Sequence, residues 1–175
     1  MTMIIKNKTL VEDDWQVLRL SDQETAEKVT VLNGKVIVPL KVWLAQRDQL
    51  QQRGELGVWF ASDERPEDLK GDVHKFQVIA VDFPKFSDGR GYSIAYNLRA
   101  RLGYAGELRA IGDVLRDQLF YMQRVGFDAF APRADRDIHD ALKGFEDFSE
   151  VYQTSFDQKQ PLFRRVQRQS KSSLV

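Results

Sequence analysis

Short apolar runs alternate with amphipathic stretches along most of the chain, and this alternation predicts strands followed by helices. Four apolar runs predict strands, at 57–60, 78–81, 109–112 and 128–131. Four stretches with apolar residues at helical spacing predict helices, at 40–50, 94–102, 115–122 and 138–152. Repeated strand–helix units are typical of a parallel sheet built from right-handed crossovers.

The number of these units limits the architecture. About four βα units are too few for a complete eight-fold barrel, which needs roughly 250 residues, and this chain has 175. We therefore predict a single α/β domain with a short, mostly parallel sheet that is either open or half-barrel-like.

The first 38 residues show a different pattern, which predicts a β-rich arm. Two short strand candidates lie in it, at 3–5 and 15–18. Asn33-Gly34 then separates two apolar runs, and this dipeptide readily adopts the positive φ angles of a tight turn. The pattern predicts an N-terminal β-hairpin over 29–38.

The far end of the chain carries Arg164, Arg165, Arg168 and Lys171 without an apolar face. Such a pattern is typical of a solvated charged end, and a partner-docking extension is the alternative. The predicted organisation has three parts: a β-rich arm at 1–38, an α/β domain at 39–153 and a basic tail at 154–175.

Composition excludes several classes of protein. Basic and acidic side chains balance at 26 each, which argues against general adhesion to nucleic acid or to an anionic membrane. No apolar run approaches the ~18 residues that span a bilayer, and the N-terminus lacks the pattern of a secretory signal. We expect a cytoplasmic protein.

The chain contains no cysteine, which excludes disulfides, thiolate nucleophiles and cysteine-ligated zinc or iron–sulfur clusters. Its two histidines, His74 and His139, lie far apart and in no ligand spacing. We expect both imidazoles to be at the surface or partly buried, and we predict no histidine-based metal site.

The stretch from Asp82 to Ser93 joins a predicted strand to a predicted helix and holds the densest group of functional side chains. Its glycines let backbone amides converge near a helix N-terminus, and Arg90 adds a forked donor. We predict an anion site or cofactor-phosphate site there, formed by Lys85, Asp88, Gly89, Arg90, Gly91, Tyr92, Ser93 and Arg116. The alternative is a turn in which Asp88 caps the helix and Arg90 pairs with a nearby carboxylate. The spacing matches neither a dinucleotide fingerprint nor a P-loop.

Asp82 and Asp113 follow two consecutive predicted strands, so they are expected at one carboxyl edge of the sheet. There they are candidates, together with Asp117, for acid–base catalysis or for holding Mg²⁺. Capping a helix or pairing with an arginine such as Arg109 or Arg116 is the other interpretation.

Aromatic side chains gather in the same part of the sequence and offer a stacking surface to a flavin ring or a partner. They are Phe83, Phe86, Tyr92, Phe120 and Tyr121. We expect Phe83 and Phe120 in the core and assign a functional role to Tyr92.

Three motifs in order, at 81–93, 106–118 and 126–130, resemble the bacterial family called domain of unknown function 934. The resemblance extends from about residue 36 to residue 152. It implies an oxidoreductase involved in sulfite reduction. Val125 stands where many members have cysteine, so a thiol role cannot operate in this chain.

A chain without cysteine cannot hold a sirohaem-linked cluster, so it is not itself the catalytic sulfite reductase. What the resemblance implies is an accessory role in assimilatory sulfite reduction. Such a protein could bind a small anion such as sulfite or phosphate, or carry electrons through a flavin or nicotinamide; the cofactor stays open. The alternatives are a non-catalytic module that docks to sulfite reductase and an unrelated enzyme with a phosphate-bearing ligand.

Overall fold

A curled sheet of eight strands organises residues 2–85, 87–133, 135 and 137–146, the part of the chain that this computed structural model describes. The strands are β1 (Thr2–Lys6), β2 (Thr9–Asp13), β3 (Gln16–Val17), β4 (Val36–Pro39), β5 (Leu56–Phe60), β6 (Val78–Phe83), β7 (Glu107–Gly112) and β8 (Ala129–Phe130). Their order in the sheet is β2-β1-β8-β7-β6-β5-β4-β3. The strands from β3 to β8 pair in parallel, whereas β1 pairs antiparallel with both β8 and β2.

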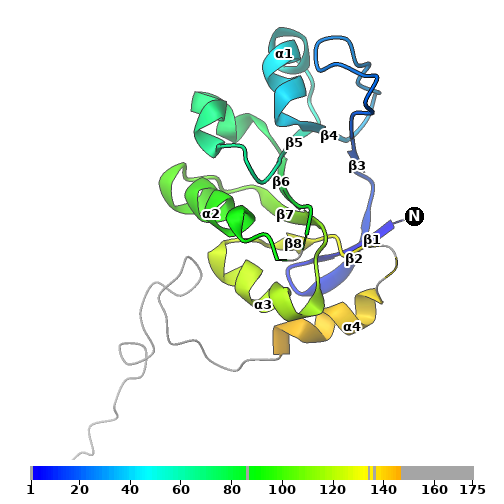
Figure 1. The fold of residues 1–175 in the computed structure, drawn as a ribbon, viewed down its shortest axis with the longest axis vertical. Helices are drawn as coiled ribbons and strands as arrows, with labels where there is room; N and C mark the ends of the chain where they lie inside the picture. The colour runs from blue at the N-terminus through cyan, green and yellow to red at the C-terminus, as the bar shows by residue number, and fades with distance from the viewer. Residues whose placement is uncertain (1, 86, 134, 136, 147–175) are drawn as a thin grey trace, which may run out of the picture.

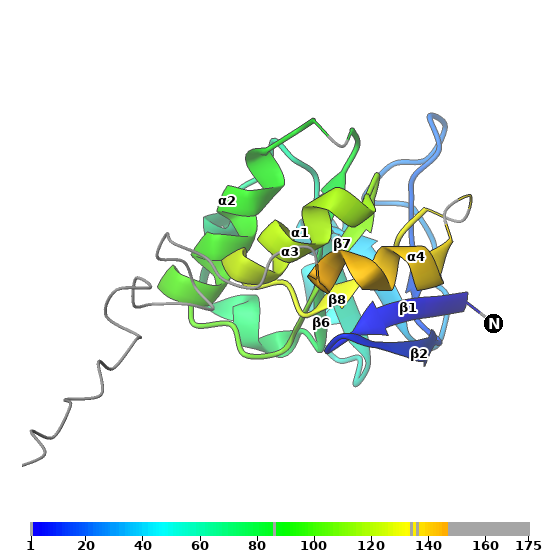
Figure 2. The ribbon, with the colours of Figure 1, turned by 90° about the horizontal axis from the view of Figure 1, so that it is seen from below.

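Helices cover the outer face of this sheet (Figures 1 and 2). The α-helices are α1 (Leu40–Leu50), α2 (Arg90–Tyr96), α3 (Arg116–Val125) and α4 (Ile138–Leu142). Two 3₁₀ segments, η1 (Pro66–Lys75) and η3 (Lys143–Glu146), and one π-helical segment, η2 (Asn97–Arg101), complete the helical structure. None of these described helices has the length and apolar character that crossing a membrane requires.

Chain geometry explains why the sheet curls. β2 and β3 lie at opposite edges of the sheet, yet only two residues separate Asp13 at the end of β2 from Gln16 at the start of β3. Three residue steps span at most ~11 Å, whereas a flat sheet of eight strands is roughly 34 Å wide. The two edges must therefore approach each other, and the sheet forms a half-barrel.

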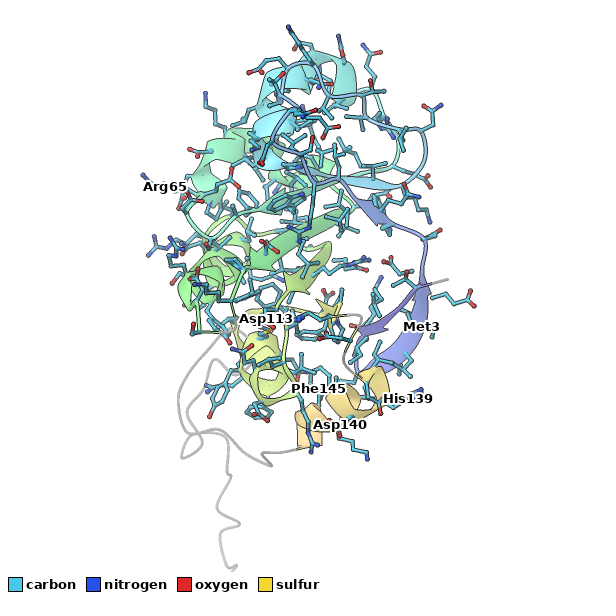
Figure 3. The ribbon with its side chains drawn as sticks, turned by 45° about the vertical axis from the view of Figure 1, so that its right-hand side comes forward. Met3, Arg65, Asp113, His139, Asp140 and Phe145 are labelled. Atoms are coloured by element: carbon cyan, nitrogen blue, oxygen red, sulfur yellow. The ribbon has the colours of Figure 1, made fainter. Side chains whose placement is uncertain are left out.

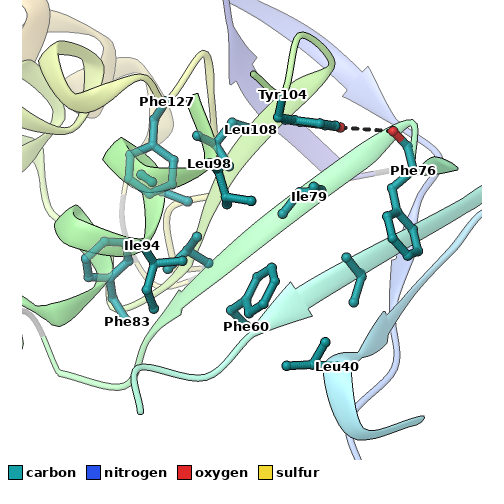
Figure 4. Packing of buried hydrophobic residues seen from close by; sticks show 14 of the residues in the cluster. Leu40, Phe60, Phe76, Ile79, Phe83, Ile94, Leu98, Tyr104, Leu108 and Phe127 are labelled. Atoms are coloured by element: carbon teal, nitrogen blue, oxygen red, sulfur yellow. Dashed lines mark hydrogen bonds between the residues drawn. The ribbon is translucent and has the colours of Figure 1, made fainter. Parts of the chain in front are cut away.

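The main core lies between the outer face of the sheet and the helices. Strand residues such as Val58, Ile79 and Leu108 are fully buried there, and Figure 4 shows Ile79 and Leu108 among aromatic side chains of the same cluster. In the same view the Tyr104 hydroxyl donates to the Phe76 carbonyl oxygen at 3.1 Å. A smaller apolar cluster lies on the inner face and contains Ile37, Val78, Ala80 and Ile111.

The predicted α/β fold and the half-barrel form of the sheet are confirmed. The four predicted strands correspond to β5, β6, β7 and β8, and the four predicted helices begin within four residues of α1–α4. The predicted size of the sheet was wrong, because the sheet has eight strands and the antiparallel pairing of β1 makes it mixed. The N-terminal strands add to both edges of the parallel array instead of standing apart.

The position of the predicted hairpin was also wrong. Residues 29–32 form no strand, and Val36–Pro39 is an internal strand that pairs in parallel with β3 and β5. All four residues of β4 are buried, as in a strand covered on both faces. The hairpin is instead β1–β2, whose turn residues Asn7 and Lys8 have φ angles of 51° and 64°.

The predicted boundary at residue 38 falls within β4, and the strands of the predicted arm share one sheet with the strands that follow. The predicted tail at 154–175 lies outside the described residues. So do Phe86 and the last positions of the helix predicted to reach residue 152.

Candidate functional site

The carboxyl ends of the parallel strands form one rim of the half-barrel, the edge at which α/β proteins bind their ligands. We define the carboxyl rim by polar residues at the ends of its strands or in the segments that follow them: Arg19, Ser62, Asp82, Asp88, Arg90, Asp113 and Arg133. In Figure 3, the rim residue Asp113, which follows β7, lies between Arg65, which follows β5, and Asp140 of α4.

Three ion pairs between a carboxylate and a guanidinium occupy this rim: Asp82–Arg19 at 2.9 Å, Asp88–Arg90 at 2.8 Å and Asp113–Arg133 at 3.3 Å. In each pair the carboxylate is the covered partner, with 13%, 14% and 15% of its side chain exposed. The guanidinium is the open partner, with 51%, 61% and 48% exposed. The rim therefore presents arginine side chains to solvent above a layer of covered carboxylates, and one of these arginines, Arg133, pairs also with the exposed Asp135 at 3.1 Å.

Arg90 links two strand exits. Its Nε and Nη2 donate to the two carboxylate oxygens of Asp88 at 3.0 and 2.8 Å, and Nη2 also donates to Ser62 Oγ at 2.8 Å. Ser62 follows β5, whereas Asp88 lies between β6 and α2. The hydrogen bonds from Arg90 hold the pKa of Asp88 well below its usual range. The Arg90–carboxylate pairing is the alternative that the sequence left open, and it joins the neighbouring strand exit as well.

Asp82 is fixed by the backbone beside it. It lies in register with Ile111 near the end of β6 and accepts from Arg19 Nη2 at 2.9 Å. A Cβ atom on Gly112 would come within 2.6 Å of Asp82 Oδ1 and within 2.5 Å of the Phe83 carbonyl oxygen. Gly112 also has a φ of +88°, which favours glycine. The close approach of β7 to the Asp82 carboxylate therefore depends on glycine at this position.

Asp113 leaves β7 directly beside this site. Its backbone N–H donates to the Phe83 carbonyl oxygen at 2.7 Å, so the β6–β7 ladder continues to the rim. Its carboxylate accepts from Arg133, which follows β8. The pairing with Arg109 that the sequence suggested is absent from the described ion pairs of Asp113, since Arg109 instead contacts Asp13 and Glu107 on the inner face.

Several residues of the predicted anion site pack against, or pair with, other residues of the fold. A Cβ atom on Gly91 would lie 2.6 Å from the Phe83 ring, so Gly91 allows α2 to pack on β6. The Tyr92 ring meets Phe83 edge-on at 5.5 Å, and burial raises the pKa of Tyr92. Arg116 begins α3 and pairs with Asp140 of α4 at 3.0 Å.

The remaining predicted residues lie in the open. Lys85 and Ser93 are exposed, the first in the loop after β6 and the second in α2. Gly89 precedes α2 and is exposed, with nothing within 4 Å of a Cβ atom placed there. Within the loop, Asp88 and Arg90 are the residues that the structure connects to another strand exit through Ser62.

The sequence analysis missed Arg19, Ser62 and Arg133. Each follows the end of a parallel strand by two or three residues, which is the same positional signal that identified Asp82 and Asp113. Arg19 was missed because β3 was assigned to a separate arm rather than to the parallel sheet.

Trp59 and Glu64, both at the exit of β5, were also missed. The indole Nε1 of Trp59 donates to the Leu18 carbonyl oxygen at 2.9 Å, and the guanidinium carbon of Arg19 lies 5.0 Å from the ring centroid. The Glu64 carboxylate accepts from the Ala61 N–H at 2.6 Å, and burial raises the pKa of Glu64. Glu64 is thus a partly buried carboxyl close in sequence to the rim residue Ser62.

A cavity of about 240 Å³ lies at the opposite, amino end of the strands. Its walls include Phe127, Phe130 and Phe145. Arg99 also lines it, but this guanidinium donates to three backbone carbonyls, those of Gly126, Tyr104 and Gly106. The cation there holds the backbone together, unlike the open guanidinium groups of the rim. Among the residues that the structure describes, no three acidic or histidine side chains gather in a metal-binding group.

Comparison with known proteins adds one finding. A family model described as a bacterial protein of unknown function (DUF934) matches residues 57–163, which is more than half of the chain. The matched stretch includes every rim residue except Arg19. No curated protein and no solved structure matches the chain.

Proposed function

The chain belongs to the bacterial family DUF934, and from this premise we propose that it is an accessory protein of assimilatory sulfite reduction. In this proposal the carboxyl rim binds a small oxyanion such as sulfite, or the phosphate group of a cofactor. The role in sulfite reduction is suggested by the resemblance of the three sequence motifs to this family. The arginine side chains of the rim are what support the anion site.

The unequal exposure of the rim ion pairs is the observation that carries the proposal. The exposed side of a guanidinium suits an oxyanion, because the N–H groups that its carboxylate partner does not use can donate charge-assisted hydrogen bonds to oxygen atoms. The covered carboxylates beneath hold the guanidinium groups in place before the ligand arrives, which lowers the ordering cost of binding. An approaching anion meets the open side of each arginine first.

This arrangement gives Asp82 and Asp113 a definite part in the proposal. They are the carboxylates expected from the sequence to do chemistry, and each holds a rim arginine. We assign them as positioning residues that orient Arg19 and Arg133.

Calorimetric titration of the full chain with sulfite, under anaerobic conditions and at low ionic strength, tests the anion site. Arg90→Gln keeps the length and polarity of the side chain but removes its charge. We expect this variant to bind sulfite about 10- to 100-fold more weakly, the usual effect of losing a charge-assisted contact. Arg101→Gln is the matched control, because Arg101 is an exposed arginine at the other end of the α2–η2 segment. Equal affinities for the wild type and both variants would remove the proposal.

The sulfur process is tested separately in cells. A deletion strain should grow with cysteine as the sulfur source and fail with sulfate. The wild-type chain should restore growth on sulfate, and the Arg90→Gln variant should not. Growth of the deletion strain on sulfate would separate the protein from sulfite reduction and leave the anion site to be judged by calorimetry.

A second candidate is a non-catalytic module that docks to sulfite reductase through the same rim. Its support is that each rim guanidinium already has a carboxylate partner, as in protein surfaces that exchange internal ion pairs for pairs with an acidic partner. Co-elution with purified sulfite reductase that is lost in Arg90→Gln, without any sulfite binding by the free chain, would favour this candidate over the first.

A further inference from the structure

Trp59 is an aromatic ring held in one orientation at the mouth of the half-barrel. It occupies the next-to-last position of β5, in register with Ala80 of β6, and Asp82 lies two residues further along the same face of β6. Its hydrogen bond to the Leu18 carbonyl oxygen restricts rotation of the indole. The neighbour in register is an alanine, so β6 places no bulky side chain beside the ring.

Arg19 covers this ring and is held there by two contacts, one with the indole and one with Asp82. The guanidinium lies over the indole at 5.0 Å and is held at its other side by Asp82 at 2.9 Å. Half of the Arg19 side chain is exposed, and both a cation–π contact and an ion pair are weak where water has access. A ligand that supplied a ring for Trp59 and a negative group for Arg19 would replace the contact between the guanidinium and the indole, while Arg19 kept its bond to Asp82.

We propose that the rim ligand is a planar heteroaromatic ring that carries a phosphate group, as a mononucleotide does, and not a bare oxyanion. The ring stacks on the Trp59 indole, and the phosphate takes the guanidinium of Arg19 together with the open side of Arg90. This inference rests on the anion site proposed above and specifies its ligand class. A bare oxyanion would use the arginines alone and would gain nothing from an aromatic ring fixed beside them.

The size of the expected preference follows from the stacking. Removal of one aromatic platform under a nucleotide base typically weakens binding by about 5- to 150-fold. A ligand with both parts should therefore bind the wild-type chain at least about ten times more tightly than inorganic phosphate does. Substitutions at Trp59 should act on the ring-bearing ligand alone, whereas Arg19 should affect both ligands.

The test compares flavin mononucleotide with inorganic phosphate in calorimetric titrations of the full chain. We expect Trp59→Leu to weaken flavin mononucleotide binding about ten-fold or more and to leave phosphate binding unchanged. Trp59→Phe keeps a ring and should retain most of the preference. Trp15→Leu is the matched control, because Trp15, like Trp59, packs against the small apolar cluster around Val78 and Ala80. This variant should change neither affinity.

Two results overturn the inference, and both differ from failure of the anion site itself. If wild-type protein binds flavin mononucleotide no more tightly than phosphate, the ring contributes nothing, even if Trp59→Leu fails to fold. If a folded Trp59→Leu variant still binds flavin mononucleotide more tightly than phosphate, the ring of the ligand does not stack on Trp59. Failure of the anion site would instead show as no binding of sulfite or phosphate by the wild-type chain.

Discussion

Two groups of arginine–carboxylate pairs lie in one half-barrel, and they differ in which partner reaches solvent. On the inner face, Arg109 is 2% exposed and pairs with Asp13 at 2.9 Å and with Glu107 at 2.7 Å. Lys6 adds a second cation on Glu107 at 2.9 Å. We call these four residues the inner cluster. At the carboxyl rim the arginines are about half exposed and only the carboxylates are covered.

In our proposal, burial of the cation, rather than the presence of an ion pair, distinguishes the structural role of the inner cluster from the binding role of the rim. Arg109 extends from β7 to the end of β2, so its bond to Asp13 joins strands that are three places apart in the sheet and supports the curl. No anion can reach this guanidinium without opening the barrel. A rim guanidinium can accept a ligand while keeping its carboxylate.

The largest loss of stability is predicted for a substitution that breaks the inner cluster. Arg109→Met leaves two carboxylates buried without their principal cation, and removing one partner of a buried pair costs about 3–5 kcal/mol. Urea unfolding at neutral pH measures this loss. Arg133→Gln at the rim is the matched control and should hardly move the unfolding midpoint. Similar destabilisation by both variants would contradict the distinction between the two regions.

A second variant disturbs the backbone beneath the rim. Gly112→Ala places a Cβ atom against the Phe83 carbonyl oxygen and Asp82 at a φ of +88°, and strain of this kind costs about 1–3 kcal/mol. Thermal or urea unfolding reports the loss. Gly54→Ala provides the control, since nothing lies within 4 Å of a Cβ atom there. If Gly112→Ala is as stable as Gly54→Ala, the close packing of β7 against Asp82 is not required.

A smaller loss of stability is predicted for the Asp72–Arg47 ion pair, which is less buried than the inner cluster. Arg47, and after it Lys75, lower the pKa of Asp72 from 3.8 to about 2. Because the folded-state pKa is depressed, the stabilisation is complete above about pH 4 and is lost as pH falls toward 2. Arg47 is partly exposed, which reduces the contribution to about 1 kcal/mol.

Asp72→Asn should therefore lower the free energy of unfolding at pH 7 and have a much smaller effect near pH 2, where the folded-state carboxyl is about half protonated. Urea unfolding at both pH values, beside the wild type, makes the comparison. An equal loss at both pH values would show that Asp72 acts through hydrogen bonding or packing and not through its charge.

The smallest effect on stability is expected at the rim itself. Arg19→Gln removes a half-exposed guanidinium whose contacts water can replace, so its unfolding midpoint should stay close to that of the wild type. Its phosphate affinity should fall clearly. A variant that is strongly destabilised would place Arg19 with the inner cluster rather than with the rim.

The part of the fold that follows from local pattern could be predicted from the sequence. The runs that became β5–β8 combine apolar strands with amphipathic helices and glycine ends, and Gly103 and Gly126 do adopt positive φ angles after their helices. The sheet edges could not be predicted in this way. β2 contains Glu12 and Asp13 within only five residues, so it has no apolar pattern of its own.

The candidate site likewise contains residues that the sequence could identify and partners that it could not. Asp82 and Asp113 could be found because each directly follows a recognisable strand, and Asp88 with Arg90 because they stand in a glycine-rich loop. The partners of Asp82 and Asp113 could not be found. Arg19 is 63 residues from Asp82 in sequence, and it comes close only because β3 lies in the same parallel array. Arg109 was assigned a rim partner because sequence alone does not show on which face of β7 its side chain lies.

Arginine side-chain NMR tests the central claim most directly. In ¹H–¹⁵N spectra of the guanidinium Nε groups, titration with phosphate should shift the signals of Arg19, Arg90 and Arg133 along one binding curve. The Arg109 and Arg101 signals should not move, the first because it is sealed in the barrel and the second because it lies at the opposite end. Rim signals that stay fixed, or that move no more than that of Arg101, would contradict the account.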